Sequence, residues 1–359
     1  MLLGNSHEMR TFNREMLTLA RESRGWTQTE MAERLGIAQA TISKIENGLR
    51  EPTDEQIRRF AAFLGYHQEF FFLPDQIKGF GSGCTYRRAR QRTTEARMRY
   101  LLGIINVRRI QIAKLLESVE LDSQNEFARL DVDEHGGPIK IAQRIRAIWK
   151  LPPGPLQNLT RAIEDAGGII FRCEFGTRDV DAISQLLPGG TPLFLVNTAI
   201  PPDRLRFTLA HEVGHIVMHE IPNDQMEKEA DIFAAELLMP AAEIRTDLMD
   251  ISLSKLATLK AYWKVSMNAL LKRAGDLRTI TERHKQFFWT QMGKHGFRTH
   301  EPVDIPLEEP TLVNEMIATY STDLGYNISE ISAVLHESED RIQNVFLPKK
   351  HKLNLVNFG

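Results

Sequence analysis

The chain has 359 residues, of which 42% are hydrophobic and 26% are charged, and its formal net charge is −2. This composition excludes disorder along the whole chain and leaves room for two or three domains of roughly 150 residues each. Two distant cysteines, Cys84 and Cys173, exclude a disulfide framework and a cysteine-rich zinc finger. No apolar run approaches the roughly 20 residues of a membrane-spanning helix, and the first ten residues lack a signal-peptide core. We therefore expect a cytoplasmic protein that does not interact with membranes.

The expected fold class is α+β and mostly α, in four parts. Residues 9–74 contain short helical patterns separated by Gly-containing turns, which predict an all-helical domain. Residues 75–150 are predicted to be a basic linker and a helical region, with helices over 94–116 and 138–149. The Pro- and Gly-rich segment 151–155 marks the entry to a third part, 151–245. The remaining residues, 246–359, are predicted to be a helical C-terminal region.

The third part is predicted to hold a small sheet followed by two long helices. Apolar and β-branched runs predict strands over 169–175, 182–187 and 193–197, and the Pro-Gly-Gly turn 188–190 makes the last pair antiparallel. Helices are predicted over 203–219 and 226–238, the second stopped by Pro240. Further helices are predicted after this part. They cover 253–277, where Ser266 is the expected N-cap of the second helix of a pair, 312–322 and 328–345.

Residues 27–48 carry the pattern of two helices joined by a tight turn. Thr27 can cap the first helix, Gly36 makes the turn, and Ile42 and Ile45 share the buried face of the second helix. The residues of the second helix that this leaves facing outward are Gln39, Ala40, Thr41, Ser43 and Lys44. Such a helix fits the major groove of DNA, where Gln39 could pair with adenine and Lys44 with guanine or phosphate. Gln28, at the start of the first helix, could reach a phosphate.

This segment resembles the Xre/Cro-repressor family of helix-turn-helix domains over about residues 10–66, including its Ser-Lys-Ile-Glu-Asn-Gly ending. The resemblance implies a double-stranded DNA operator as partner and a homodimer. The alternative is a helical bundle without DNA binding, because residues 9–66 hold nine basic and eight acidic side chains. Residues 76–114 hold ten Lys or Arg against one acid. The run Tyr86–Arg92 within them could add phosphate contacts or be only a linker.

The sharpest motif is His211-Glu-Val-Gly-His215. Residues four apart share one face of a helix, so the two imidazoles can hold one Zn²⁺, and Glu212 beside them can act as a general base for water. Apolar flanking residues predict a buried helix, in which unpaired polar groups would be costly. A third ligand is expected from the next helix, which offers Glu227, Glu229 and Asp231.

Residues 206–219, together with 227–240, resemble the ImmA/IrrE family of zinc metallopeptidases, and the resemblance covers about residues 150–245. It implies a zincin-like domain with His211, His215 and Glu229 as metal ligands and Glu212 as the catalytic base. Glu227 is the alternative third ligand, and Mn²⁺ is the alternative ion. Asp231 could orient a ligand imidazole or be a surface acid. His219 could line the cleft or be structural.

The two resemblances together imply a DNA-binding regulator with a metalloendopeptidase domain. It would cleave itself or a partner Xre-type repressor in a stress, prophage or toxin–antitoxin response. The alternative is a ligand- or metal-sensing transcription factor whose peptidase-like domain is not catalytic. Residues 193–197 are expected to be an edge strand that pairs with a substrate backbone. The helix pair 253–277, which carries five basic residues, could contact DNA or pack against the peptidase domain.

Overall fold

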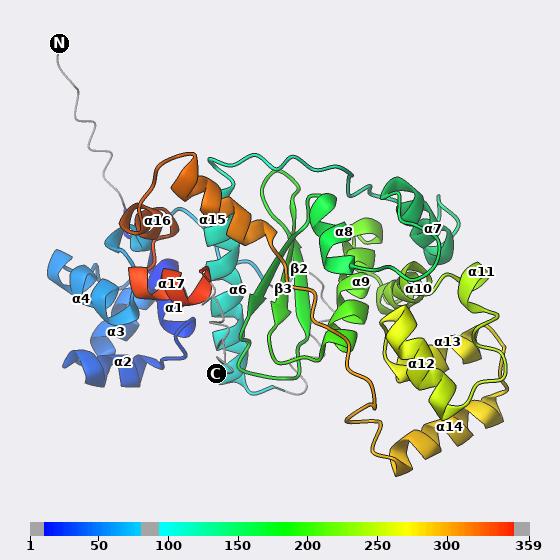
Figure 1. The fold of residues 1–359 in the computed structure, drawn as a ribbon. Coiled ribbons are helices and arrows are strands. Elements are labelled where there is room, and N and C mark those ends of the chain that lie inside the picture. The colour runs from blue at the N-terminus through cyan, green and yellow to red at the C-terminus, as the bar shows by residue number, and fades with distance from the viewer. Residues whose placement is uncertain (1–10, 80–92, 348–359) are drawn as a thin grey trace, which may run out of the picture. The chain divides into compact units, whose positions relative to one another are not determined.

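The computed structural model describes residues 11–79 and 93–347, which form two compact units (Figure 1). Among the described residues, the first unit combines 11–79 with 94–120 and 311–347, and the second unit spans 121–310 together with Thr93. The basic run Tyr86–Arg92 and Cys84 lie outside the described residues. The first unit is thus built from three separate stretches of sequence. Within residues 11–79 and 93–347, no helix is long and apolar enough to cross a membrane.

The first unit begins with four short helices and a 3-10 helix. These are α1 (Arg14–Glu22), α2 (Gln28–Leu35), α3 (Gln39–Glu46), α4 (Asp54–Leu64) and η1 (Gln68–Phe72). Thr27 caps α2 in a reciprocal capping box with Glu30, as the sequence indicates, and Gly36 ends α2 in the left-handed conformation at φ 63°. Ile42 and Ile45 of α3 are buried in the core, so α3 keeps its other face outward.

The same unit is completed by α6 (Glu95–Leu115) and by three helices from the end of the chain. The latter are α15 (Leu312–Thr322), α16 (Ile328–Leu335) and α17 (Glu339–Val345). Their link to the N-terminal helices includes a hydrogen bond of 2.8 Å between His67 Nε2 and the Ser332 hydroxyl. The C-terminal helices therefore belong to the same compact body as α1–α4.

Helices α16 and α17 repeat the geometry of α2 and α3. Asn327 and Glu330 form the same capping box as Thr27 and Glu30, and His336 stands where Gly36 stands, in the same left-handed conformation with φ 52°. The two segments align without a gap, Ile342 matching Ile42 as the buried residue of the second helix. The sequence predicts one helical stretch over 328–345 and no repeat. The structure breaks that stretch at His336 and so contains a second helix-turn-helix in this unit.

The second unit contains a three-stranded sheet of order β1-β3-β2. The strands are β1 (Ile169–Cys173), β2 (Ala182–Leu186) and β3 (Pro192–Asn197), and the antiparallel pairing of β2 with β3 is confirmed. The expectation that residues 193–197 form an edge strand is wrong. β3 is central, parallel to β1 on one side and antiparallel to β2 on the other, and its six residues are all buried. This burial explains its continuous apolar run.

Eight helices of the second unit are described, and they supply most of its core. They are α7 (Pro138–Ile148), α8 (Leu159–Asp165), α9 (Pro202–Met218), α10 (Met226–Leu238), α11 (Ala241–Ile244), α12 (Leu253–Trp263), α13 (Met267–Asp276) and α14 (Glu282–Lys294). Ser266 caps α13, as the sequence predicts. Helix α14 is not predicted by the sequence pattern. Its exposed Phe287 and Trp289 blur the separation between an apolar and a polar face.

Helices α9 and α10 are packed closely, which is the feature that builds the site. A side-chain carbon added at Gly214 would lie 3.0 Å from the Phe233 ring and 3.3 Å from the Ala230 backbone. Glycine at this position thus permits the approach of the two helices. As a result, the polar residues of the first turns of α10 face the two motif histidines of α9.

Candidate metal centre and nucleic-acid interface

Three donor groups from α9 and α10 converge on one point. The Nε2 atoms of His211 and His215 lie 3.0 Å apart. Carboxylate oxygens of Glu227 lie 3.7 Å from His211 Nε2 and 3.3 Å from His215 Nε2. A tetrahedral ion with ligand bonds of about 2.0–2.1 Å places its donor atoms roughly 3.3 Å apart. These three residues, whose donor atoms all lie within 4.8 Å of one another, therefore fit a single metal ion.

The charge around the cluster favours a bound cation. Burial alone would lower the pKa of His211, but a hydrogen bond with Asp231 and the charges of Glu212, Asp231 and Glu227 outweigh it and raise the pKa. Burial would likewise raise the pKa of Asp231, whereas its hydrogen bonds with His211 and Lys272 lower it to about 2. Asp231 thus stays ionised behind His211, in the orienting role that the sequence left open.

The outer ring nitrogens of the two motif histidines are held by further residues. His211 Nδ1 lies 3.0 Å from Asp231 Oδ1, whose other oxygen accepts a 3.0 Å hydrogen bond from Lys272. His215 Nδ1 lies 3.0 Å from His219 Nδ1, and His219 Nε2 lies 3.0 Å from Glu229 Oε2.

These contacts fix the tautomers of all three imidazoles. A carboxylate only accepts hydrogen bonds, so His211 Nδ1 and His219 Nε2 must donate. A neutral His219 then accepts at Nδ1, and His215 Nδ1 is the donor. In their neutral forms, both motif histidines then direct an unprotonated Nε2 into the cluster, which is the form that binds a metal ion.

The two candidate third ligands occupy different places. Glu227 lies against both Nε2 atoms, while Glu229 is hydrogen-bonded to His219. The sequence favours Glu229, and the geometry brings Glu227 to the cluster instead. The side chain of His219 is 2% exposed, so this histidine is an internal link and not a surface group.

Glu212 lies next to the cluster and is held by a residue that the sequence pattern does not single out. Its side chain is buried, and its Oε2 accepts a 2.5 Å hydrogen bond from the Ser184 hydroxyl on β2. A lone serine inside a strand carries no motif, so only the pairing of the sheet with α9 identifies it. Ser184 fixes the direction of the carboxylate that the motif assigns as a base.

Strand β2 presents one edge of the sheet beside Glu212. The hydrogen bonds Leu187 N–Thr191 O and Asn197 N–Asp181 O bracket its pairing with β3. Because paired residues alternate in an antiparallel ladder, the backbone groups of Ala182, Ser184 and Leu186 point away from β3. Among the described residues β2 pairs on one side only. β2 is thus the edge strand of the described sheet that lies beside Glu212, although four of its five residues are buried.

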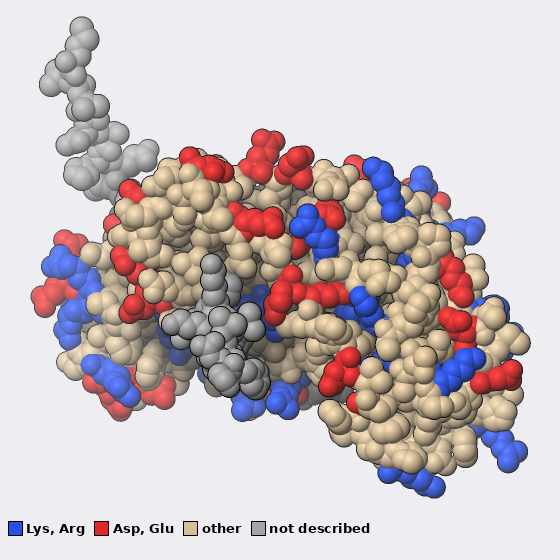
Figure 2. Space-filling model, viewed as in Figure 1, with Lys and Arg blue, Asp and Glu red and all other residues tan. Residues whose placement is uncertain are grey.

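In the first unit, α3 presents the residues predicted to contact DNA. Gln39, Ala40 and Lys44 are exposed, while Thr41 and Ser43 are half-buried. Figure 2 shows basic and acidic side chains intermixed over the part of the view that holds α2–α4, in keeping with the nearly balanced charge of residues 9–66.

Gln28 is tied into a hydrogen-bonded chain that ends at Gln39 of α3. Its amide donates to Glu46 at 2.6 Å, and its oxygen accepts a 2.8 Å bond from the Gln39 amide. Glu46 is in turn held by Arg21, with a closest distance of 2.7 Å. This chain orients Gln39 at the start of α3, where side chains reach base edges in helix-turn-helix complexes.

Comparison with known proteins agrees with both resemblances, that of the helix-turn-helix segment and that of the segment with the metal cluster. Residues 163–274 match the family model of the IrrE N-terminal-like domain, a metallopeptidase family. Residues 17–70 match the helix-turn-helix family model. The chain joins an Xre-type helix-turn-helix domain to an IrrE-family domain. A 31-residue stretch is also 55% identical to Antitoxin HipB of Escherichia coli (strain K12). That stretch is 9% of this chain and 35% of the antitoxin, so the chain spans about a third of that relative's length.

The IrrE-family match covers α12 and most of α13, whose basic residues are engaged internally. Lys260 is buried and bonds Asp203 and Glu301, and Arg273 is buried against Glu236 and the Met239 carbonyl. Lys272 bonds Asp231. Lys255 and Lys264 donate to the backbone carbonyls of residues 249 and 157. This arrangement favours packing within the IrrE-family domain over contact with DNA.

Arg206 of α9 lies outside the metal cluster. It donates a 2.6 Å hydrogen bond to the Leu156 carbonyl and pairs closely with Glu308. Burial lowers its pKa to about 10. Arg206 therefore ties the start of α8 and the segment before α15 to α9, which is a structural role.

Proposed function

We propose that this chain is a DNA-binding transcriptional regulator whose IrrE-family domain is a metal-dependent endopeptidase. The observation that carries the proposal is the convergence of His211 Nε2, His215 Nε2 and the Glu227 carboxylate beside a buried, oriented Glu212. His211, His215 and Glu227 hold the ion, with Glu229 as the alternative third ligand. Zn²⁺ is the expected ion and Mn²⁺ the alternative.

The residues of the chain have defined parts in peptide hydrolysis. A bound ion would supply Lewis-acid polarisation of the scissile carbonyl and of the attacking water. Glu212 takes a proton from that water and passes it to the leaving amine nitrogen. Ser184 keeps the Glu212 carboxylate in one orientation through its hydrogen bond. The backbone of the substrate adds to the edge of β2, which brings it past Glu212.

The substrate is proposed to be this chain itself or an Xre-type repressor, so that cleavage ends repression under stress or on prophage induction. The helix-turn-helix domain binds an operator in double-stranded DNA as a homodimer, with α3 in the major groove. The similarity to an antitoxin supports a place in a toxin–antitoxin system. Sedimentation of the protein–operator complex tests the dimer, and one chain per operator at saturation would contradict it.

The decisive experiment compares the full chain with its Glu212→Gln variant after loading with Zn²⁺. Labelled Glu212→Gln chain is added as a substrate to unlabelled wild type, and fragments are identified by mass spectrometry. Glu220→Gln, an exposed acid on the same segment, is the matched control. We expect equal metal content in all three proteins, and cleavage of the labelled chain or of a co-expressed repressor only by wild type and the control.

Absence of cleavage by metal-loaded wild type would contradict the peptidase proposal. If operator binding and its response to metal were then retained in Glu212→Gln, the domain would act as a metal sensor. That result would identify the alternative function, a metal-sensing transcription factor, because a sensor needs a site that binds the metal ion but does not need catalysis.

A further inference from the structure

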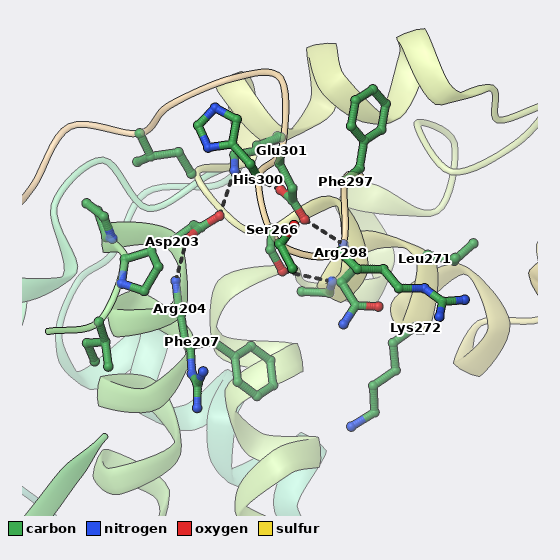
Figure 3. A pocket seen from close by; sticks show the side chains of 18 of the residues that line it. Asp203, Arg204, Phe207, Ser266, Leu271, Lys272, Phe297, Arg298, His300 and Glu301 are labelled. Carbon is green, nitrogen blue, oxygen red and sulfur yellow. Dashed lines mark hydrogen bonds and ion pairs between the residues drawn. The ribbon is translucent and has the colours of Figure 1, made fainter. Parts of the chain in front are cut away.

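A large hollow in the IrrE-family domain lies beyond the metal cluster and is not used by the chemistry described above. Its volume is about 1480 Å³, and it is lined by the first turns of α9, by α13 and α14, and by residues 297–305 (Figure 3). All of these segments belong to the second unit. The size is well above that needed for a small ligand and suits a stretch of polypeptide.

The hollow adjoins the first half of α9, the helix that carries His211 and His215. Arg204 and Thr208 line it, and the same helical face reaches His211 and His215 one and two turns further on. Lys272 lines it too, and that residue bonds Asp231, the partner of His211. On the sheet side, Asp181 at the wall of the hollow directly precedes β2. A peptide laid along the edge of β2 therefore enters the hollow where it leaves the strand.

Apolar surface in the hollow is provided by three aromatic side chains. Phe207 comes from α9, Trp289 from α14 and Phe297 from the segment after α14. Trp289 is 41% exposed, and Figure 3 shows Phe207 and Phe297 among the side chains that line the space. Large exposed aromatic side chains in a concave site are typical of a surface that binds an apolar group.

Most of the charges around the hollow are already paired with one another. Lys260 bonds Asp203 at 2.6 Å and Glu301 at 2.7 Å. Arg298 differs from these groups. Its guanidinium lies 4.8 Å from the centre of the Trp289 ring and donates to the Trp289 carbonyl at 3.0 Å. Within residues 11–79 and 93–347, none of the ion pairs joins Arg298 to a carboxylate. Its remaining donors are therefore positioned for an anion beside the aromatic surface.

We infer that this hollow binds the polypeptide substrate next to the scissile bond and selects a large apolar side chain adjoining an acidic one. The apolar side chain packs on Trp289 and the acidic one pairs with Arg298, whose guanidinium lies 4.8 Å from the centre of the Trp289 ring. This inference rests on the proposed peptidase function and adds the class of substrate sequence to it.

The test uses a synthetic peptide library and the Zn²⁺-loaded full chain, with two lining variants and two matched controls. Trp289→Ala is compared with Phe287→Ala, which removes an exposed aromatic ring of α14 that does not line the hollow. Arg298→Gln is compared with Arg283→Gln, an exposed arginine of α14 outside it. Metal content is measured for each protein to verify that the cluster is unchanged.

We expect Trp289→Ala to raise KM about tenfold with little change in kcat, because uniform binding is lost. Arg298→Gln is expected to reduce the preference for an acidic residue about tenfold and to leave apolar selection intact. Binding of the preferred peptide to the inactive Glu212→Gln chain, followed by fluorescence polarisation, should weaken by the same factors.

The outcomes distinguish failure of this inference from failure of the proposed peptidase function. If wild type cleaves no peptide and Glu212→Gln binds none, the peptidase proposal fails. If wild type cleaves peptides but both lining variants behave as their controls do, the peptidase stands and the hollow is not its substrate site.

Discussion

Glu337 and Arg24 form a buried ion pair of 2.8 Å although they lie 313 positions apart in the chain. The Glu337 side chain is fully buried and also accepts hydrogen bonds from Arg108 at 2.8 Å and from Gln111 and Arg341 at 2.7 Å each. Burial alone would raise the pKa of Glu337, but the Arg108 and Arg24 charges hold it far below its ordinary range. One carboxylate thus joins α6 and the second helix-turn-helix to the end of α1.

Glu337→Gln is expected to destabilise the first unit by about 3–5 kcal/mol, because Arg24 and Arg108 would remain buried without their counter-charge. Hydrogen exchange of the α1 and α6 amides measures the effect, and α9 in the other unit serves as the internal reference. Glu339→Gln, at an exposed position two residues on, is the control. Equal exchange in the two variants would mean that the pair is not needed for stability.

Acidification is expected to weaken the same unit in two steps. Burial, followed by the charges of Lys114 and His67, lowers the pKa of His336 to about 4 from its ordinary 6.5. The unfolded chain then binds more protons than the folded one between these values, so stability falls as the pH drops from 6.5 to 4. The pKa of Glu337 is depressed, so its contribution is complete above 4.5 and is lost at lower pH.

His336→Asn should remove the upper step, since asparagine tolerates the left-handed backbone at this position. Thermal unfolding of the first unit between pH 7 and pH 4 measures it. His284→Asn, an exposed histidine of the other unit, is the control. An unchanged slope between pH 6.5 and pH 4.5 in His336→Asn would count against this assignment.

The parts of this molecule that the sequence predicts are those encoded over a few turns or strands. The spacing of His211 and His215, the capping at Thr27 and the three strands are local patterns, and the structure has them. The buried ion pairs of Glu337 could not be predicted in this way, because its partners Arg24 and Arg108 are brought to it only by tertiary packing. The central position of β3 also depends on its pairing with β1, which no local pattern records.

Glu227 and Glu229 show the same limit within one helix. Both lie in the first turn of α10, and two residues along a helix point in widely different directions. Which of them meets His215 is set by how α10 is rotated against α9, and the contact of Gly214 with Ala230 and Phe233 fixes that rotation. Sequence spacing alone permits either choice.

Glu227→Gln and Glu229→Gln are therefore expected to differ in metal affinity. Glu227→Gln removes a ligand carboxylate and should abolish stable Zn²⁺ loading. Glu229→Gln removes the carboxylate bonded to His219 and should weaken the affinity for Zn²⁺ by about 10–100-fold. Competition with a zinc chelator dye measures both dissociation constants. Glu220→Gln is the exposed control. The reverse order, with Glu229→Gln unable to hold Zn²⁺, would assign the ligand role to Glu229.

Substitutions on α3 are expected to separate base reading from phosphate contact. Gln39→Ala should reduce the free energy of binding to the preferred operator by about 1–3 kcal/mol and relax the sequence preference, because Gln28 holds the Gln39 amide at the start of α3, where side chains reach base edges.

Lys44→Ala should weaken binding to all DNA sequences alike if Lys44 contacts a phosphate. It should then also reduce the slope of the salt dependence of binding by about one unit. Fluorescence titrations at several salt concentrations, with an operator selected from random DNA, measure both effects. Arg58→Ala, an exposed change on α4, is the control. A loss of sequence preference in Lys44→Ala would instead show that this lysine reads guanine, and unchanged binding in Gln39→Ala would remove α3 from base recognition.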